Sequence, residues 1–109
     1  MRIGRKRREA ELAGMCKVAC IGDSITYGYT ILSRAAHCYP TQLGQLLGAG
    51  FHVENFGVTG STAQSDSIDA YTRTSAFLKS VAYQPDIAVV MLGTNDSARH
   101  NWHGEETFI

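Results

Sequence analysis

Three short polar segments each follow an apolar run, and their residue types suit acyl-transfer chemistry. The segments are Gly22-Asp23-Ser24, Asn55 to Gly60, and Gly93-Thr94-Asn95-Asp96. If each one closes a strand of a parallel sheet, all three lie at the same edge, where open α/β folds place their ligands. Ser24 would then offer a hydroxyl nucleophile. The N–H groups of Ser24 and Gly60 and the side-chain amide of Asn95 would offer hydrogen bonds to an oxyanion.

Each segment on its own has a simpler interpretation. Asp and Ser are both preferred at helix N-caps, so Gly22-Asp23-Ser24 alone favours a cap. The glycines of the second segment are typical of a flexible loop, and the third segment alone is typical of a turn. Only the three segments taken together indicate a site.

The first elements expected along the chain are two strands separated by a helix. Cys16 to Ile21 is apolar without polar alternation, which predicts a strand buried on both faces. Tyr39 to Leu47 is predicted to be a helix, opened by Pro40 and ended by Gly48. Phe51 to Phe56 is predicted to be the second strand.

The second half of the predicted fold repeats this order. Residues Gly57 to Asp69 have a loop composition, and a helix is predicted from Ile68 or Tyr71 to Tyr83. Ile87 to Leu92 is the most apolar stretch and predicts a central strand. The resulting βαβαβ unit implies parallel strands joined by right-handed crossovers. With three strands only, Phe51–Phe56 or Ile87–Leu92 would lie at an edge, and an apolar edge invites pairing with another chain.

Composition limits the class of protein. Of the 109 residues, 44% are hydrophobic and 18% are charged, which is ordinary for a globular protein and argues against disorder, a fibre or a membrane span. Five of the ten basic residues fall within the first eight positions. We expect residues 1–14 to be a solvated, disordered basic head, or an upstream extension of a chain that starts at Met15. A nucleic-acid or membrane arm is the alternative. No apolar signal-peptide region follows the basic residues, so a cytoplasmic protein without nucleic-acid or membrane partners is expected.

Cysteine and histidine spacing predicts neither a disulfide framework nor a metal site. Cys16, Cys20 and Cys38 are odd in number and lack CxxC spacing, so we expect reduced, mostly buried thiols. His100 and His103 have no third ligand of suitable spacing.

Taken jointly, the three segments resemble the blocks of the SGNH hydrolases, also called GDSL-type esterases and lipases. The stretch from Gly22 to Gly28 resembles the first block, Asn55 to Gly60 the second, and Gly93 to Asp96 the third. Tyr39-Pro40 and Pro85-Asp86-Ile87 are also typical of members. The resemblance covers Met15 to about Asp96.

This resemblance implies a flavodoxin-like three-layer α/β/α sandwich with parallel strands in the order 2-1-3-4-5, here only its N-terminal βαβαβ part. It implies that Ser24 is the nucleophile and that Gly60 and Asn95 complete the oxyanion hole, without a metal or organic cofactor. The positions expected to support them are Gly22, Asp23, Asn55, Gly93 and Asp96. The stretches Val18–Gly28 and Asn95–Trp102 resemble bacterial carbohydrate O-acetylesterases, which implies short acyl esters such as acetylated carbohydrate.

The sequence departs from the family pattern at the block that supplies the general base. The fourth block, Asp-x-x-His, does not occur among the residues after Asn95, and Asp96 with His100 or His103 does not match its spacing. We therefore expect residues 15–109 to be the N-terminal part of such a domain and to be inactive alone. Two alternatives stay open: a non-catalytic binding or dimerising module that pairs through residues 87–92, and a phosphate-binding α/β module. The second lacks both GxGxxG and GxxxxGK[ST] patterns.

Overall fold

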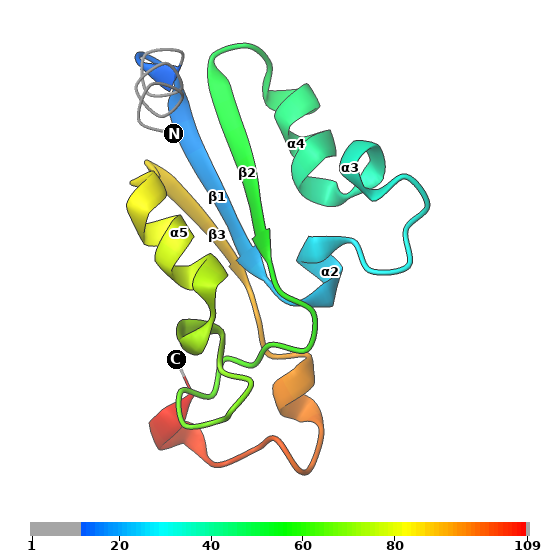
Figure 1. The fold of residues 1–109 in the computed structure, drawn as a ribbon, viewed down its shortest axis with the longest axis vertical. Coiled ribbons are helices and arrows are strands. Elements are labelled where there is room, and N and C mark those ends of the chain that lie inside the picture. Colours follow the sequence, from blue (N-terminus) through cyan, green and yellow to red (C-terminus); the bar gives the residue numbers. More distant parts are fainter. Residues whose placement is uncertain (1–11, 109) are drawn as a thin grey trace.

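The computed structural model describes residues 12–108 of the chain (Figure 1). Most of the predicted basic head lies outside this range. Its last residues form a turn in which Met15 N donates to Leu12 O at 3.0 Å. Within residues 12–108, no helix has the length and apolar character that crossing a membrane requires.

Three parallel strands form one sheet in the order β2-β1-β3. They are β1 (Cys16–Gly22), β2 (Phe51–Gly57) and β3 (Ile87–Met91). Gly22 at the end of β1 pairs with Gly57 on one side and Met91 on the other. All three strands therefore end at one level (Figure 1). The predicted α/β class is confirmed, and the order agrees with the first three strands of a flavodoxin-like sheet.

Helices flank this sheet in the manner of a doubly wound fold. The connection from β1 to β2 carries α2 (Ser24–Tyr27), α3 (Arg34–His37) and α4 (Tyr39–Leu47). The connection from β2 to β3 carries η1 (Tyr71–Arg73) and α5 (Ser75–Tyr83). The two connections cross the sheet in opposite directions, so right-handed crossovers put α4 and α5 on opposite faces.

Local sequence accounts for the helix boundaries. Pro40 occupies the first turn of α4, and Gly48 ends it with a φ of 87°. The helix predicted to begin at residue 68 or 71 begins instead at Ser75, after the short η1. The reason is Thr74, which is extended and whose hydroxyl accepts a hydrogen bond from Phe77 N at 3.2 Å, so a new helix starts there.

The core is small and centres on β1. Its buried apolar residues are Val18, Ala19, Cys20, Cys38, Phe56, Ala63, Ala70 and Tyr71. Four consecutive residues of the loop after β2, residues 61–64, are also buried. This segment is therefore fixed in the fold, in contrast to the flexible loop that its composition alone favours.

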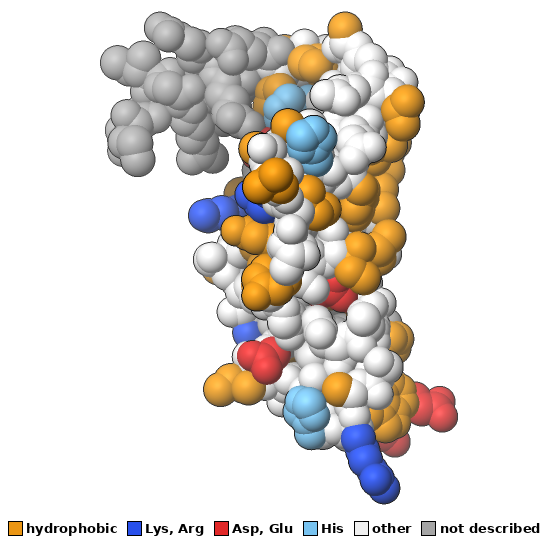
Figure 2. Space-filling model, turned by 90° about the vertical axis from the view of Figure 1, so that its right-hand side faces the viewer, with side chains coloured by type: hydrophobic (Ala, Val, Ile, Leu, Met, Phe, Trp, Pro, Cys, Tyr) orange, Lys and Arg blue, Asp and Glu red, His pale blue; other side chains and the backbone are white. Residues whose placement is uncertain are grey.

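The expectation that Ile87–Leu92 forms a central strand is wrong for the described residues, while the expectation that a three-stranded sheet leaves an apolar strand at its edge is confirmed. β3 lies at one edge of the sheet, β2 at the other, and β1 in the centre. Ile87 and Val90 are 46% and 59% exposed, because β3 pairs only with β1 while α5 packs on β1 and β2. Apolar side chains also reach the surface on the α3 and α4 side (Figure 2), where Leu32 and Leu46 are exposed.

The three cysteines are free, and only Cys16 is part-exposed. Among residues 12–108, no group of three or more His, Cys, Asp or Glu side chains is arranged to hold a metal ion.

Candidate active site

Ser24 lies two residues beyond β1, at the start of the single-turn helix α2. Asp23 caps this helix, since its Oδ1 accepts a hydrogen bond from Ile25 N at 2.9 Å. Asp23 is 1% exposed, and its Oδ2 has no hydrogen-bond partner among the described residues. Within residues 12–108 the Ser24 hydroxyl and N–H make no hydrogen bond either. Both Ser24 groups therefore remain available to a ligand.

The second segment docks directly onto the first. The Gly22 carbonyl accepts hydrogen bonds from Val58 N at 2.9 Å and from Ser61 Oγ at 3.3 Å. A Cβ at Gly22 would lie 2.1 Å from Thr26 Oγ1 and 2.7 Å from Met91 O. Only glycine fits where the end of β1 meets α2 and β3 so closely.

Asn55 holds α2 in place through hydrogen bonds of its side chain to the backbone. Its Nδ2 donates to Thr26 O at 2.9 Å, and its Oδ1 accepts from Gly57 N at 2.8 Å. A Cβ at Gly57 would lie 2.3 Å from Tyr27 N, so the two backbones touch here. The Asn55 side chain thus joins the first two segments.

Gly60 sits on an exposed turn after β2 with a φ of 84°. The turn is closed by a hydrogen bond from Ser61 N to Val58 O at 3.2 Å. Gly60 N has no acceptor among residues 12–108, and no atom lies within 4 Å of where its Cβ would be. Its N–H is therefore without a hydrogen-bond partner among these residues.

Asn95 begins η2 (Asn95–Ser97) and binds Ser61, the residue that follows the second segment. Its Nδ2 donates to Ser61 O at 2.9 Å. A primary amide carries two N–H bonds, so one Asn95 donor remains. Gly93, just before it, adopts a φ of 120°, which a residue with a side chain rarely takes.

Asp96 secures the loop after β2. It is 2% exposed, and its two carboxylate oxygens accept hydrogen bonds from Ala63 N and Gln64 N, each at 2.8 Å. Both oxygens are thus committed to backbone, and neither orients His100 or His103.

The three predicted segments are joined into one surface at the carboxyl ends of the strands. Ser61 links them, since its hydroxyl bonds the first segment and its carbonyl accepts from Asn95. Figure 1 shows α2, the loop after β2 and the turn after β3 at the same end of the sheet. The Ser24 N–H, the Gly60 N–H and the second Asn95 N–H are three donors that no described residue satisfies.

No histidine of the described residues hydrogen bonds to Ser24. His52 Nδ1 pairs with Tyr83 OH at 2.6 Å, His37 Nδ1 with Leu32 O at 3.2 Å, and His103 Nδ1 with Asp66 Oδ1 at 2.7 Å. Residues 12–108 therefore hold an uncommitted serine without a bonded general base.

The pair of Asp66 and His103 was missed by sequence reasoning. The hydrogen bond from His103 holds the pKa of Asp66 below its ordinary value of 3.8. Nothing in the local sequence pairs a residue of the loop after β2 with one that follows η2.

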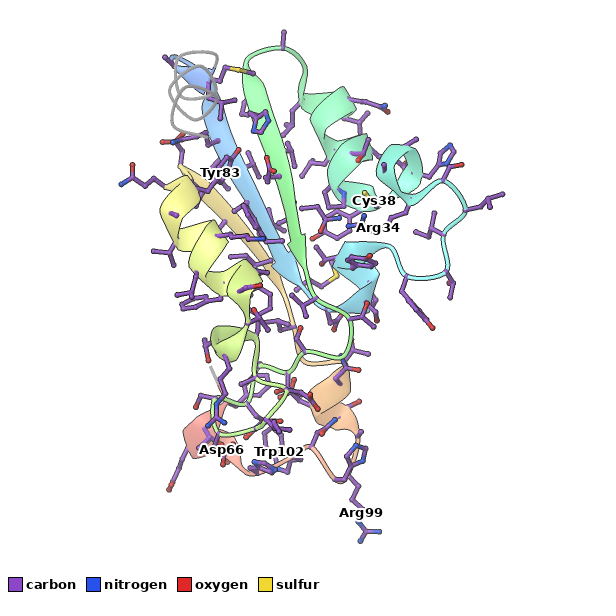
Figure 3. All side chains as sticks on the ribbon, in the orientation of Figure 1. Arg34, Cys38, Asp66, Tyr83, Arg99 and Trp102 are labelled. Carbon is purple, nitrogen blue, oxygen red and sulfur yellow. The ribbon has the colours of Figure 1, made fainter. Side chains whose placement is uncertain are left out.

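Two titratable groups behind α2 are shifted by their surroundings. Burial raises the pKa of the Cys38 thiol, but hydrogen bonds with Thr41 and Asn55 and the charge of Arg34 lower it by more, so the net shift is downward. Burial raises the pKa of Tyr39, whose hydroxyl lies 3.1 Å from Thr26 Oγ1. Figure 3 shows Arg34 and Cys38 side by side between α2 and α3, on the inner side of the helices.

Comparison with known proteins agrees with the three blocks. The model of the GDSL-like lipase/acylhydrolase family matches residues 20–108. An acetylxylan esterase of Xylanibacter ruminicola is 45% identical over 91 residues, which cover 83% of this chain and 19% of that protein. The chain thus spans about a fifth of the length of that relative. No solved structure matched the chain. The family match includes all three blocks and most of the sequence, and the chain belongs to the GDSL-like lipase/acylhydrolase family.

Proposed function

We propose that this chain supplies the nucleophile and the oxyanion-binding groups of a carboxylic-ester hydrolase. The observation that carries the proposal is the set of three unsatisfied donors at the edge where Ser24 lies. Membership of an acylhydrolase family supports it. In this proposal Ser24 is the nucleophile, and its N–H, Gly60 N–H and Asn95 Nδ2 bind the oxyanion.

The reaction proceeds through an acyl-enzyme. Ser24 Oγ attacks the ester carbonyl while a general base takes its proton, and the carbonyl oxygen becomes an oxyanion. The C–O bond to the alcohol then breaks, and the alcohol leaves with the proton. Water attacks the acyl-enzyme by the same route and releases the acid. Each oxyanion donor is worth about 2.7–4 kcal/mol of barrier.

The base in this proposal is a histidine outside residues 12–108, within an Asp-x-x-His segment of the kind the family resemblance implies. Loss of a triad member commonly removes a factor of about 10⁴ to 10⁶ in rate. We therefore propose that the 109-residue chain is inactive alone and that further sequence completes the enzyme. The short coverage of the acetylxylan esterase supports this view.

The proposed substrate is a short acyl ester, such as an acetyl group on a carbohydrate hydroxyl. The name of the Xylanibacter ruminicola relative supports acetylated xylan as the substance to test first.

Two measurements test the function. The coding DNA after the Ile109 codon is expected to encode Asp-x-x-His, and the extended protein should release acetate from acetylated xylan, with the activity lost in Ser24→Ala. The 109-residue chain should hydrolyse p-nitrophenyl acetate no faster than its Ser24→Ala variant. Serine-dependent turnover by the short chain, or an extended protein that is indifferent to Ser24→Ala, would contradict the proposal.

A second candidate function is self-association without catalysis. The exposed apolar side chains of β3 favour it, since Ile87, Val90 and Met91 are all more than 40% exposed on an edge strand.

A further inference from the structure

A hollow lies beside the candidate active site and is not used by the proposed chemistry. It is a cavity of about 540 Å³, within the range of about 300–1,000 Å³ typical of small-molecule sites. Its lining residues are Gly93, Asp96, Ser97, Arg99, Trp102 and Phe108. Figure 3 shows Trp102 and Arg99 at the end of the molecule beyond the carboxyl ends of the strands.

The hollow shares its wall with the third segment of the candidate site, because Gly93 and Asp96 lie on either side of Asn95. Met91 pairs with Gly22 across neighbouring strands. Gly93 in the hollow wall and Ser24 each lie two residues beyond this pair. Asn95 is one of the three oxyanion donors in the proposed function, so an ester bound there would lie against the same segment that lines the hollow.

We propose that this hollow is a carbohydrate subsite, in which Trp102 forms the platform for a pyranose ring and Arg99 donates hydrogen bonds to its hydroxyl groups. The inference rests on the proposed function, because it places the sugar part of the ester whose acyl part lies at Ser24. A pyranose has an apolar face of C–H groups and a rim of hydroxyls. The half-exposed indole of Trp102 would pack against the apolar face, and the N–H groups of Arg99 would donate to the hydroxyls.

The aromatic wall is exposed and has a definite shape. Trp102 is 49% exposed and Phe108 is 40% exposed, and their ring centroids lie 5.7 Å apart at 53°. Phe108 Cζ lies 3.7 Å from where a Cβ on Gly93 would be, so the Phe108 ring packs close to the Gly93 backbone. Trp102 thus packs against another surface ring and keeps half its area open.

Arg99 is available to a ligand. Within residues 12–108 it has no hydrogen-bond or ion-pair partner. The acidic residue of the lining is Asp96, and both of its carboxylate oxygens accept hydrogen bonds from Ala63 N and Gln64 N. A guanidinium carries five N–H donors and no acceptor, which suits the oxygens of a sugar.

The segment that carries the wall is held in position before any ligand binds. Gln64 Nε2 donates to Gly104 O at 3.1 Å, and Ser65 N donates to Thr107 O at 2.8 Å. The bond between Asp66 and His103 adds a third tie. A platform fixed in this way loses little conformational entropy on binding.

Trp102 is the single tryptophan of the chain, so its fluorescence reports on the hollow directly. We would titrate the 109-residue chain with xylotetraose, which has no ester and needs no catalysis. A saturable change in emission is expected, with at least fivefold weaker binding for Arg99→Ala. Arg73→Ala removes an exposed arginine of η1 that does not line the hollow, and should bind as the wild type does.

Calorimetry extends the test to the platform itself. Trp102→Ala should abolish the heat of binding, Trp102→Phe should restore part of it, and the circular dichroism spectra should match the wild type. No saturable signal with xylotetraose would overturn the subsite, as would equal losses in Arg99→Ala and Arg73→Ala. An emission change that follows protein concentration instead of sugar would identify a protein interface and also overturn it.

The two proposals fail separately. Xylotetraose binding that is lost in Arg99→Ala, in an extended protein without Ser24-dependent acetate release, would support the subsite and refute the esterase. Ser24-dependent acetate release without any xylotetraose binding would leave the esterase standing and refute the subsite.

Discussion

Asp96 and Asn55 hold the backbone of the candidate site, and each uses both polar atoms of its side chain to do so. Asp96 accepts two N–H bonds from the loop after β2, and Asn55 bridges β2 to α2. The resemblance assigns both a supporting role, yet their contacts could not be derived from the sequence. Apart from Gly57, which is two residues from Asn55, their partners lie about 30 residues away in the chain, and only the folded register brings them together.

Asp96→Asn should destabilise the chain, although the Asp and Asn side chains have nearly the same size. The amide would turn an NH₂ donor toward Ala63 N or Gln64 N, so that two donors face each other in a buried place. A loss of about 1–3 kcal/mol in the free energy of unfolding is expected, to be measured by urea denaturation. Asp86→Asn, at an exposed acid, is a control expected to cost less. Equal stability of Asp96→Asn and the wild type would refute this role.

Tyr71 should make the chain sensitive to alkali. Burial raises the pKa of its phenol from 10.0 to about 12, and its hydroxyl donates to Phe56 O at 2.6 Å. A raised folded-state pKa gives stability that is fully present below pH 10 and is lost as the pH rises through about 12. Urea midpoints measured across this window should fall more steeply for the wild type than for Tyr71→Phe. Parallel curves would contradict the prediction.

At the scale of elements, the candidate site depends on close contact between α2 and the end of β2. Gly57→Ala should prevent folding, because the new Cβ would lie 2.3 Å from the backbone N of Tyr27. Gly44→Ala is the matched control: its Cβ would meet Val53 at an ordinary 3.5 Å, and replacing a helical glycine gains roughly 0.5–1 kcal/mol. Circular dichroism and thermal melting measure both. A cooperative melt of Gly57→Ala near the wild-type temperature would show that the contact is not needed.

The segment after η2 is tied to the loop after β2 in a way that acid should weaken. His103 lowers the pKa of Asp66 below 3.8, so the stabilising contribution of this pair is present above pH 3.8 and is lost as the pH falls through the lower folded-state value. Trp102 emission should therefore show a transition below pH 3.8 that Asp66→Asn lacks. Coincident profiles for the two proteins would exclude this tie as the cause.

Elements whose ends are marked by proline or glycine were predicted well from the sequence. Pro40 and Gly48 bracket α4, and the structure places this helix at Tyr39–Leu47 as predicted. The later helix was predicted too long, because Thr74 acts as a cap and divides it from η1. The sequence alone does not show whether a threonine caps a helix or lies inside one, because Thr occurs in both positions and the tertiary fold helps to decide between them.

At the scale of the whole molecule, burial was the least predictable property. The apolar run of β3 has the composition of a strand covered on both faces, but within the described residues only β1 pairs with it. An apolar composition indicates that a strand favours burial on both faces, but it does not show which strands and helices lie beside it. The radius of gyration of 15.1 Å is above the roughly 13 Å of a compact chain near this length, because the molecule is elongated, with extents of 44 × 29 × 23 Å.

The exposed edge leads to a prediction about association. If copies of the 109-residue chain pair through β3, Val90→Lys should weaken the dimer at least tenfold, because a lysine on an edge strand opposes strand pairing. Val81→Lys is the matched control, since Val81 on α5 is 58% exposed against 59% for Val90. Sedimentation velocity over a range of concentrations measures both variants and the wild type. A wild-type chain that stays monomeric throughout, or equal weakening by both lysines, would exclude β3 as the interface and leave its apolar side chains to contacts within a longer protein.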